Sequence, residues 1–391
     1  MKYSFDEVID RTGTAAVKID GMKEVWGRTD LLPLWVADMD FATPPFILDA
    51  IRRRCEHPIL GYTEKPESYY QAIIGWVKRR YGMEVSKEQL NYVPGIVAGL
   101  GMALNCFTVP GDKVMIMPPV YHPFAWLVQR NGRRLVECPL KLENGTYRMD
   151  LDLFRRSIKG VRVLILCNPH NPGGVVWTKE ELETLADVCA EDNVIVFSDE
   201  IHADLTLPPH RHVPFAMISE HARNNSVTFM APSKAFNMPG MAASHTVIYN
   251  EGLRKRFVSY LDAGELDMGH VLAYPAVEAA YTEGDEWLEQ CLAYVQANID
   301  YVEAYLQENL PAIQAMRPQA SYLVWLDCRK LGLSQEALVD FFVSGARLAL
   351  NDGAMFGKEG EGFMRMNVGC PRSILEQAMK QLKEAYDNLC R

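Results

Sequence analysis

The sequence lacks the signals of a secreted, membrane-spanning or nucleic-acid-binding protein. Nowhere do about eighteen apolar residues follow one another, so no membrane-spanning helix is predicted. The first residues, MKYSFDEVIDR, carry acidic side chains and no apolar stretch, and we therefore expect no signal peptide. Forty basic residues against fifty acidic ones give a formal net charge of −10 without a basic stripe, which argues against a nucleic-acid partner.

Paired cysteines are also missing. The nine cysteines are odd in number and scattered, without the short spacings of a disulfide framework or a zinc site. We therefore expect a reducing, cytoplasmic setting and no bound metal. The chain contains no tandem repeat and no low-complexity tract.

Apolar residues are plentiful. They make up 48% of the 391 residues, enough for a large core, and the length predicts two domains. Strand-like and helix-like patterns alternate from about residue 93 to 250, and one helix opens with a capping box formed by Thr178 and Glu181. Alternation of this kind predicts an α/β fold with a mostly parallel sheet.

A second unit is predicted near the end of the chain. A long helical pattern follows Gly284, two strand patterns cover Tyr322 to Leu326 and Phe363 to Val368, and a last helix covers Ser373 to Leu389. We expect a large domain over residues 46–284, and a smaller α/β domain formed by residues 1–45 and 285–391.

Polar residues follow three apolar runs of the predicted large sheet. Val161 to Cys167 leads into a turn that contains Asn171, and Asn193 to Phe197 leads to Asp199. The run from Ser226 to Met230 leads to Lys234. Because ligands of open α/β sheets bind outside the carboxyl ends of the strands, we expect the amide, the carboxylate and the lysine on one rim.

These three groups suit pyridoxal 5′-phosphate. A lysine amine can hold the aldehyde of this cofactor as an imine, and a carboxylate can keep its ring nitrogen protonated. An amide can donate to its phenolic oxygen. Alone, Lys234 would be interpreted as a surface lysine on a loop, and the other two residues make the cofactor site the stronger interpretation.

At this point the chain resembles the class I and II aminotransferases, a family that depends on pyridoxal phosphate, and more closely their cystathionine β-lyase branch. The resemblance covers nearly the whole chain and rests on these segments: WVADMDFATPP, YHPF, CNPHNPGG, SDEIHAD, SKAFN and RMNVGCPR. It implies the fold of the fold-type I pyridoxal-phosphate transferases, with a mostly parallel sheet of seven strands in the large domain.

The resemblance implies roles for individual residues around the cofactor ring. Lys234 corresponds to the imine lysine, Asp199 to the partner of the ring nitrogen, and Asn171 to the donor to the phenolic oxygen. Tyr121 corresponds to the aromatic residue stacked on the ring, or else is a core tyrosine at the end of a strand. His202 stands where many members have a tyrosine, and its alternative is a histidine satisfied by hydrogen bonds at the sheet edge.

The cofactor phosphate is expected at the start of a helix. A Pro-Gly turn precedes Ile96 and Val97, and unpaired N–H groups at a helix N-terminus favour an anion, although such a turn can also simply lead into a packed helix. In the family this loop holds the phosphate, and the tyrosine of a Gly-Tyr pair, here Tyr62, reaches it from the neighbouring subunit. The resemblance therefore implies a homodimer with shared active sites.

Two positions depart from the family pattern at the phosphate. Many members have an arginine eight residues after the lysine, where this chain has Ala242, and a serine three residues before it, where this chain has Ala231. The phosphate would then be met by backbone N–H groups, by Ser233, by Tyr62 and by the helix terminus. Any further group that replaces the arginine is not identified by the sequence.

The substrate is expected to be a small amino acid bound through its α-carboxylate. Arg365 matches the arginine that clamps this group in the family, and a guanidinium suits a carboxylate because it can bind bidentately. Arg372 is a weaker candidate and is interpreted as a surface residue at a helix start. The main chain around Ala37 and Asp38 is a second expected contact to the same carboxylate.

The reaction is less clearly indicated than the cofactor. In both candidate reactions the freed amine of Lys234 removes the Cα proton of the substrate. The resemblance favours a C–S β-lyase that cleaves L-cystathionine or related S-substituted L-cysteines to a thiol, pyruvate and ammonia. The alternative enzyme is an aminotransferase of unknown amino donor. A purely regulatory role through protein contacts would leave the imine chemistry unused.

Overall fold

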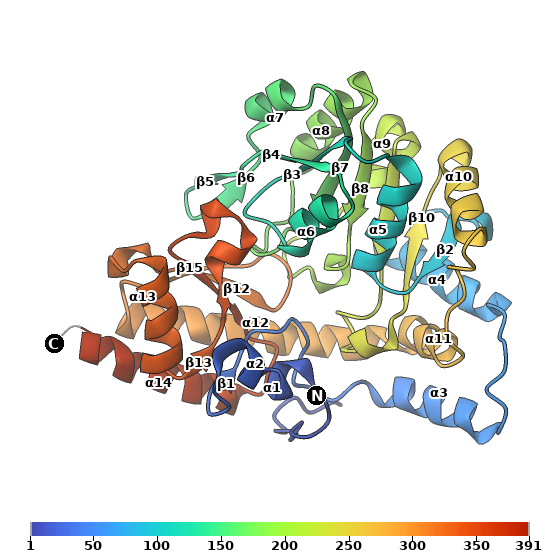
Figure 1. The fold of residues 1–391 in the computed structure, drawn as a ribbon. Coiled ribbons are helices and arrows are strands. Elements are labelled where there is room, and N and C mark those ends of the chain that lie inside the picture. The colour runs from blue at the N-terminus through green and yellow to red at the C-terminus, as the bar shows by residue number, and fades with distance from the viewer. Residues whose placement is uncertain (1, 390–391) are drawn as a thin grey trace.

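A mixed sheet of seven strands forms the centre of the computed structural model, which describes residues 2–389 (Figure 1). Five neighbouring strands, β4, β3, β7, β8 and β9, run parallel, and β10 is antiparallel to both of its neighbours. The order across the sheet is β2 (Leu90–Val93), β10 (Ser244–Val247), β9 (Ser226–Met230), β8 (Ile195–Asp199), β7 (Val161–Cys167), β3 (Lys113–Ile116) and β4 (Arg134–Glu137). The predicted seven-stranded, mostly parallel sheet is confirmed.

Both faces of this sheet are covered by helices. On β7, Val163 and Ile165 pack into one hydrophobic cluster, whereas Leu164 and Leu166 pack into another on the opposite face. This explains the nearly continuous apolar run, because a strand between two helix layers has no solvent-facing side. The helices of this part are α4 (Glu67–Tyr81), α5 (Ile96–Phe107), α6 (Pro123–Arg130), α7 (Leu151–Ser157), α8 (Lys179–Glu191), α9 (Glu220–Asn224), α10 (Glu251–Asp262) and α11 (Ala273–Glu283).

A second, antiparallel sheet lies in the C-terminal unit, residues 285–389. Its order is β11 (Gln314–Met316), β12 (Leu323–Asp327), β15 (Phe363–Asn367) and β14 (Asn351–Asp352). The helices α12 (Asp285–Asn309), α13 (Gln335–Asp340) and α14 (Arg372–Leu389) belong to the same unit. The long helix α12 extends from the C-terminal unit toward α11 in Figure 1.

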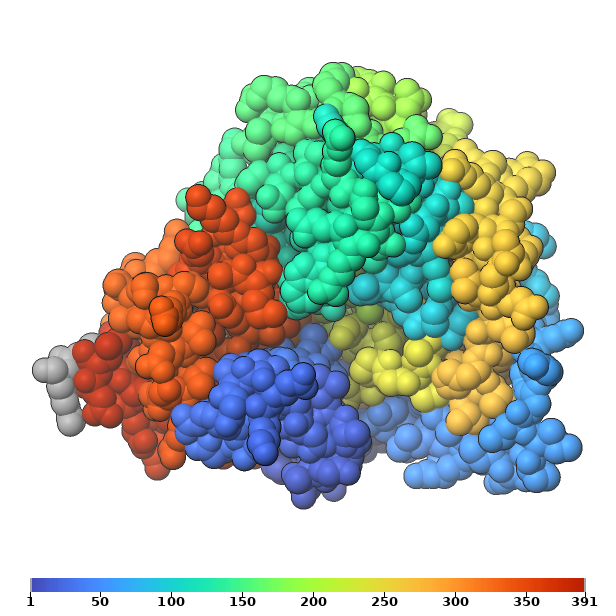
Figure 2. Space-filling view, viewed as in Figure 1, coloured from blue at the N-terminus to red at the C-terminus, as the bar shows by residue number. Residues whose placement is uncertain are grey.

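The N-terminal segment joins the C-terminal unit. Its elements are α1 (Val17–Asp20), α2 (Met22–Trp26), β1 (Leu32–Pro33) and α3 (Pro45–Glu56), and β1 pairs in parallel with β13 (Leu348–Ala349). Figure 2 shows the segment, in blue, against the orange and red C-terminal unit. The helix α3 instead packs on α11. The proposed division into residues 46–284 and residues 1–45 with 285–391 agrees with this arrangement and stays a prediction.

The predicted local elements are present, with limits that differ by one or two residues in β8, β12, β15 and α14. Thr178 and Glu181 form the predicted capping box, with the Glu181 backbone N–H donating to the Thr178 hydroxyl at 3.2 Å. The strand predicted over Asn193 to Phe197 instead covers Ile195–Asp199, because Asn193 has a φ of 55° and belongs to the turn before it. Asp199 is therefore the last residue of the strand.

Among the described residues no helix is both long and apolar enough to cross a membrane. The eight described cysteines are free, and seven of them are buried. A small β5 (Lys141–Glu143) and β6 (Thr146–Arg148) hairpin completes the strands.

Backbone hydrogen bonds join the C-terminal unit to loops of the large sheet. The N–H groups of Gln319 and Ala320 donate to the carbonyl of Gly174 at 2.8 and 3.1 Å, and Ser321 donates to Leu205 at 2.9 Å. Gly174 has a φ of +66°, and a Cβ there would lie 2.5 Å from the side chain of Pro318. Both the backbone conformation and the close approach therefore require glycine at this joint.

We predict that Gly174→Ala lowers the free energy of unfolding by more than an alanine in the left-handed conformation would without a steric contact. The left-handed conformation costs about 1–2 kcal/mol, and the contact with Pro318 adds about 1–3 kcal/mol. Gly160→Ala is the matched control, because Gly160 has a φ of +75° and its Cβ would meet only the Lys113 amine at 3.8 Å. Thermal unfolding should show the larger drop for Gly174→Ala. Equal drops would mean that the joint yields to the added methyl group.

Candidate functional site

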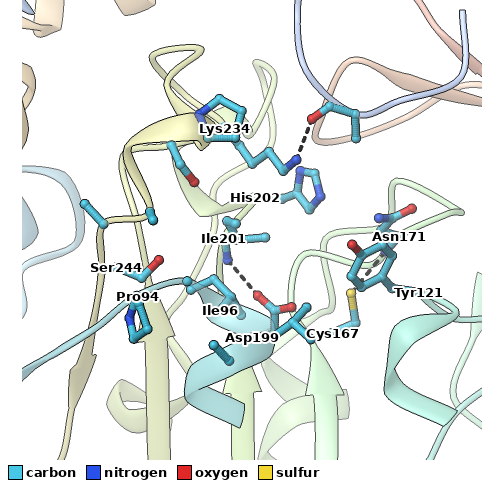
Figure 3. A pocket seen from close by; sticks show the side chains of 18 residues that line it. Pro94, Ile96, Tyr121, Cys167, Asn171, Asp199, Ile201, His202, Lys234 and Ser244 are labelled. Carbon is cyan, nitrogen blue, oxygen red and sulfur yellow. Dashed lines mark hydrogen bonds between the residues drawn. The ribbon is translucent and has the colours of Figure 1, made fainter. Parts of the chain in front are cut away.

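A cavity of about 340 Å³ opens at the carboxyl ends of β7, β8 and β9. This is the rim at which the sequence places Asn171, Asp199 and Lys234, and all three line the cavity (Figure 3). Its volume is within the range of small-molecule sites. The other lining residues are Ala37, Pro94, Gly95, Ile96, Val97, Ala98, Tyr121, Cys167, Ile201, His202, Ser233, Pro239, Ala242, Ala243 and Ser244.

Lys234 follows β9 and is held by a backbone carbonyl. Its amine donates to the carbonyl oxygen of Ala37, which comes from the N-terminal segment. Burial and the nearby Arg365 guanidinium lower the pKa of Lys234 to about 8. A lower pKa increases the fraction of neutral amine near neutral pH, and only the neutral amine can attack a carbonyl or accept a proton.

Asp199 is a buried carboxyl group with one hydrogen bond. Its Oδ1 accepts from the backbone N–H of Ile201 at 3.1 Å. Burial raises the pKa of Asp199 to about 7, which exceeds the opposing effects of Ile201 and Lys234. A positive charge placed beside this carboxyl would favour its ionised form. The group is therefore suited to pairing with a protonated ring nitrogen.

His202 lies between the lysine amine and the side of the cavity that holds Asn171 and Tyr121 (Figure 3). Its Nδ1 atom is buried and has no hydrogen-bond partner among the described residues. No sheet-edge hydrogen bond in the described part of the chain satisfies this atom, and contact with the cofactor stays the prediction for His202. Burial, together with the charges of Lys234 and Arg365, lowers the pKa of His202 to about 3, so the imidazole is neutral. A neutral imidazole offers one donor and one acceptor.

Arg365 contacts Asn171 directly, a pairing that the sequence did not indicate. One guanidinium nitrogen donates to the Asn171 Oδ1 atom at 3.0 Å, and the other donates to Asn351 at 2.6 Å and to the carbonyl of Trp35 at 3.2 Å. The Nε atom is buried and has no partner among the described residues. Because the amide oxygen of Asn171 is occupied, its NH₂ group remains as the donor toward the cavity.

Tyr121 stands at the start of α6 and lines the cavity beside Asn171 (Figure 3). Its ring packs edge-on against Phe124, with ring centroids 5.7 Å apart. Burial raises the pKa of its phenol. The position suits an aromatic wall, as the sequence predicts, although the ring also belongs to the surrounding core.

The N-terminus of α5 faces the other end of the cavity. Ile96 and Val97 are its first residues, and Gly95 before them has a φ of +144°, which favours glycine. Ser233 and Ser244 line the same cavity, and neither hydroxyl has a hydrogen bond to the described residues. Unpaired N–H groups and free hydroxyls together make a site for an oxyanion.

Residues 35–41 lie over the cavity and are held by side chains on both sides. The Asn367 amide donates to the carbonyls of Val36 and Asp38 at 2.7 Å each. The Asn237 amide donates to Met39 and Phe41 at 2.9 and 2.7 Å. These asparagines lie two residues after Arg365 and three after Lys234, so the segment is tied to both predicted functional regions.

A cluster of four charged side chains also holds this segment in place. Its members are Arg11, Lys18, Asp38 and Asp40. Arg11 binds Asp38 at 2.6 Å and Asp40 at 2.9 Å, and the fully buried Lys18 binds Asp40 at 2.7 Å. The Asp38 carboxylate is therefore directed at Arg11 and does not line the cavity. The carbonyls of Ala37 and Asp38 accept hydrogen bonds from Lys234 and Asn367. A substrate carboxylate also only accepts, so it could bind this stretch through its N–H groups.

Arg365 does not line the cavity itself but contacts Asn171, which does. Two other predicted residues lie away from the cavity. The side chain of Tyr62 is 98% exposed and lies in a separate groove with Leu60 and Met268. Arg372 binds Asn298 and Ala297 on α12, as expected for a structural residue at a helix start.

Several residues at the site carry no signal in the sequence. Tyr322 donates to the Ala37 carbonyl at 2.9 Å, yet it reads only as part of an apolar strand. Ser244 lies in a short strand with no motif, and Arg11 lies in an irregular segment far from the other site residues in the chain. Asn237 could have been found, because it is a polar residue among apolar ones, three positions after Lys234.

The family model for class I and II aminotransferases matches residues 29–382. The chain belongs to the class I and II aminotransferase family. Within it, the chain is 41% identical over 384 residues to cystathionine β-lyase PatB of Bacillus subtilis (strain 168), covering 98% of this chain and 99% of PatB.

Solved structures of similar proteins contain pyridoxal phosphate. The pyridoxal-phosphate-bound C–S lyase of Staphylococcus hominis has a TM-score of 0.92 and 35% identity, with 98% of each chain covered. A pyridoxal-phosphate-bound protein of Clostridium difficile 630, provisionally assigned as an aminotransferase, has a TM-score of 0.96 and 42% identity, with 98% of this chain and all of that chain covered.

The residues present here fit such a cofactor. A partly buried lysine and a buried carboxyl group with one hydrogen bond lie in the same cavity as two hydroxyls and a helix N-terminus. The unpartnered His202 Nδ1 atom adds a polar group that needs a partner.

We predict that the Lys234 amine of the cofactor-free protein titrates near pH 8. The lysines can be dimethylated with ¹³C-formaldehyde and their methyl resonances followed by NMR against pH. The resonance absent from a Lys234→Met variant reports this residue, and its midpoint should lie near the lowered pKa of about 8. A midpoint above pH 10 would mean that burial does not destabilise this ammonium group.

Proposed function

We propose that this protein is a pyridoxal-phosphate-dependent C–S β-lyase that cleaves L-cystathionine or related S-substituted L-cysteines to a thiol, pyruvate and ammonia. The observation that carries the cofactor is the convergence of Lys234, Asp199 and Asn171 on one cavity. The similarity to PatB and to the C–S lyase of Staphylococcus hominis supports the lyase reaction. The bound cofactor would act as an electron sink for the substrate Cα.

Lys234 would hold the cofactor and then act as general base on the substrate Cα proton. Its lowered pKa of about 8 makes a neutral amine accessible near neutral pH. The Ala37 carbonyl accepts from the amine and would stabilise it again as an ammonium after it has taken the proton. Asp199 would pair with the ring nitrogen, Asn171 and His202 would face the phenolic oxygen, and Tyr121 would lie against the ring.

Arg365 would bind the substrate carboxylate. Its guanidinium is already oriented by Asn171 and Asn351, so little side-chain entropy remains to be lost on binding. The buried Nε atom has no partner, which leaves a donor for an anion. The N–H groups of Ala37 and Asp38 are proposed as further donors, and their carbonyls are not.

We predict continuous β-elimination by the cofactor-loaded protein. With L-cystathionine and no 2-oxo acid present, pyruvate and free thiol should appear in equal amounts over many turnovers. Lys234→Ala should abolish both, because it removes the imine-forming amine and the general base. Lys255→Ala is the control, since this exposed lysine pairs only with Glu251 on α10.

The alternative is an aminotransferase of unknown amino donor. It would give a single conversion of the cofactor to its amine form, with no thiol and no pyruvate, and turnover only after a 2-oxo acid is added. That outcome would overturn the lyase proposal while leaving the cofactor site intact.

We further propose a homodimer with shared active sites. Exposed apolar side chains gather around Tyr62, namely Ile59, Leu60 and Met268, which are 65%, 62% and 51% exposed. Such side chains favour burial against another surface. In a second copy of the chain, Tyr62 would reach the phosphate end of the cavity. A cytoplasmic location is also proposed, and the free state of the described cysteines agrees with it.

We predict that two impaired variants restore activity when mixed. Heterodimers of Lys234→Ala and Tyr62→Ala would contain one site with both residues intact, so random subunit exchange should recover about a quarter of wild-type activity at limiting cofactor. Mixing Lys234→Ala with the Lys234→Ala/Tyr62→Ala double variant provides no intact site and is the control. No recovery in the first mixture would place Tyr62 outside the partner's site.

A further inference from the structure

We propose that Ser244 is a phosphate ligand that, with Ser233 and the N-terminus of α5, takes the place of the arginine that this chain lacks at Ala242. The cradle would then hold the cofactor phosphate through neutral donors alone. The inference rests on the proposed use of pyridoxal phosphate and extends it to a residue without a motif.

The position of Ser244 follows from the pairing of two strands. Ser244 is the first residue of β10, and it lies opposite Val93, the last residue of β2. The chain of β2 passes directly from Val93 through Pro94 and Gly95 into α5, whose first residue is Ile96. The antiparallel register therefore places Ser244 beside the turn that starts the helix, and Figure 3 shows its side chain next to Pro94.

Ser244 is a buried residue whose hydroxyl is unpaired and open to the cavity. The residue is 4% exposed and lines the cavity, and its hydroxyl has no hydrogen bond to any described residue. Ser233 is likewise 8% exposed and unpaired. Hydroxyls of buried residues normally have partners, and an oxyanion in the cavity would accept from both. This is independent of the helix terminus, which supplies its own unpaired N–H groups.

No side-chain cation is available at this end of the cavity. Among the described residues that line it, Lys234 is the only lysine or arginine, and its amine points to Ala37 and away from Ser244 (Figure 3). The turn at Ala242 has a left-handed φ of 48°, and the Ala242 carbonyl accepts from the Tyr92 hydroxyl at 2.7 Å. The phosphate charge would therefore be met by the helix dipole and by hydroxyl and N–H donors.

The test compares two ligands that differ only in the phosphate. Dissociation constants for pyridoxal 5′-phosphate and for pyridoxal are measured with cofactor-free protein by the imine absorbance. Ser244→Ala should weaken pyridoxal 5′-phosphate by about tenfold or more, as expected for a lost hydrogen bond to a charged group, and should change pyridoxal by less than about twofold. Ser244→Thr keeps the hydroxyl and should restore most of the affinity.

Thr228→Val is the matched control. Thr228 lies on the neighbouring strand β9, its hydroxyl is buried and unpartnered, and it does not line the cavity. This variant should leave both dissociation constants unchanged. Equal weakening of both ligands by Ser244→Ala would indicate a structural role and overturn the assignment, as would no change for either ligand. A wild-type protein without preference for the phosphorylated ligand would overturn the proposed cofactor itself.

Discussion

Burial of β7, β8 and β9 on both faces is the constraint on which the rest of this structure depends. Strands covered by helices on each side carry few charged residues along their length, and Arg162, near the start of β7, is an exposed residue. Polar side chains of the site therefore gather where the strands end. Asp199 is the last residue of β8, and Lys234 and Asn171 follow β9 and β7 within a few residues. The same burial lowers the pKa of the lysine and raises that of the carboxyl group. The sheet thus supplies both the position and the electrostatics of the candidate site.

The second constraint is that segments from both ends of the sequence pack against this rim. Residues 35–41 come from the N-terminal segment, and Arg365 and Asn367 come from β15 of the C-terminal unit. The cluster of four charges, Arg11, Lys18, Asp38 and Asp40, has equal numbers of cations and anions, so the buried Lys18 is compensated where it lies. Carbonyl groups of residues 35–41 accept hydrogen bonds from side chains of both units, such as Asn237 and Asn367.

The fold and the local part of the site could be predicted from the sequence because they depend on neighbouring residues. Apolar runs followed by turns locate Asn171, Asp199 and Lys234, with an error of two residues in the limits of β8. The contact between Arg365 and Asn171 spans 194 positions, and that between Tyr322 and Ala37 spans 285, so no local pattern contains them. Ser244 was missed for the same reason, because its place depends on the register of β10 against β2.

The shared carbonyl of Ala37 has a consequence for how the entrance of the cavity behaves during a catalytic cycle. It accepts hydrogen bonds from both Lys234 and Tyr322, one from each side of the rim. A lysine nitrogen bonded to carbon would have fewer hydrogens to donate, which would weaken its attachment to the N-terminal segment. Covalent chemistry at Lys234 is therefore thermodynamically linked to the mobility of residues 35–41. The chain that covers the substrate would loosen while the lysine is occupied and tighten when its amine is free.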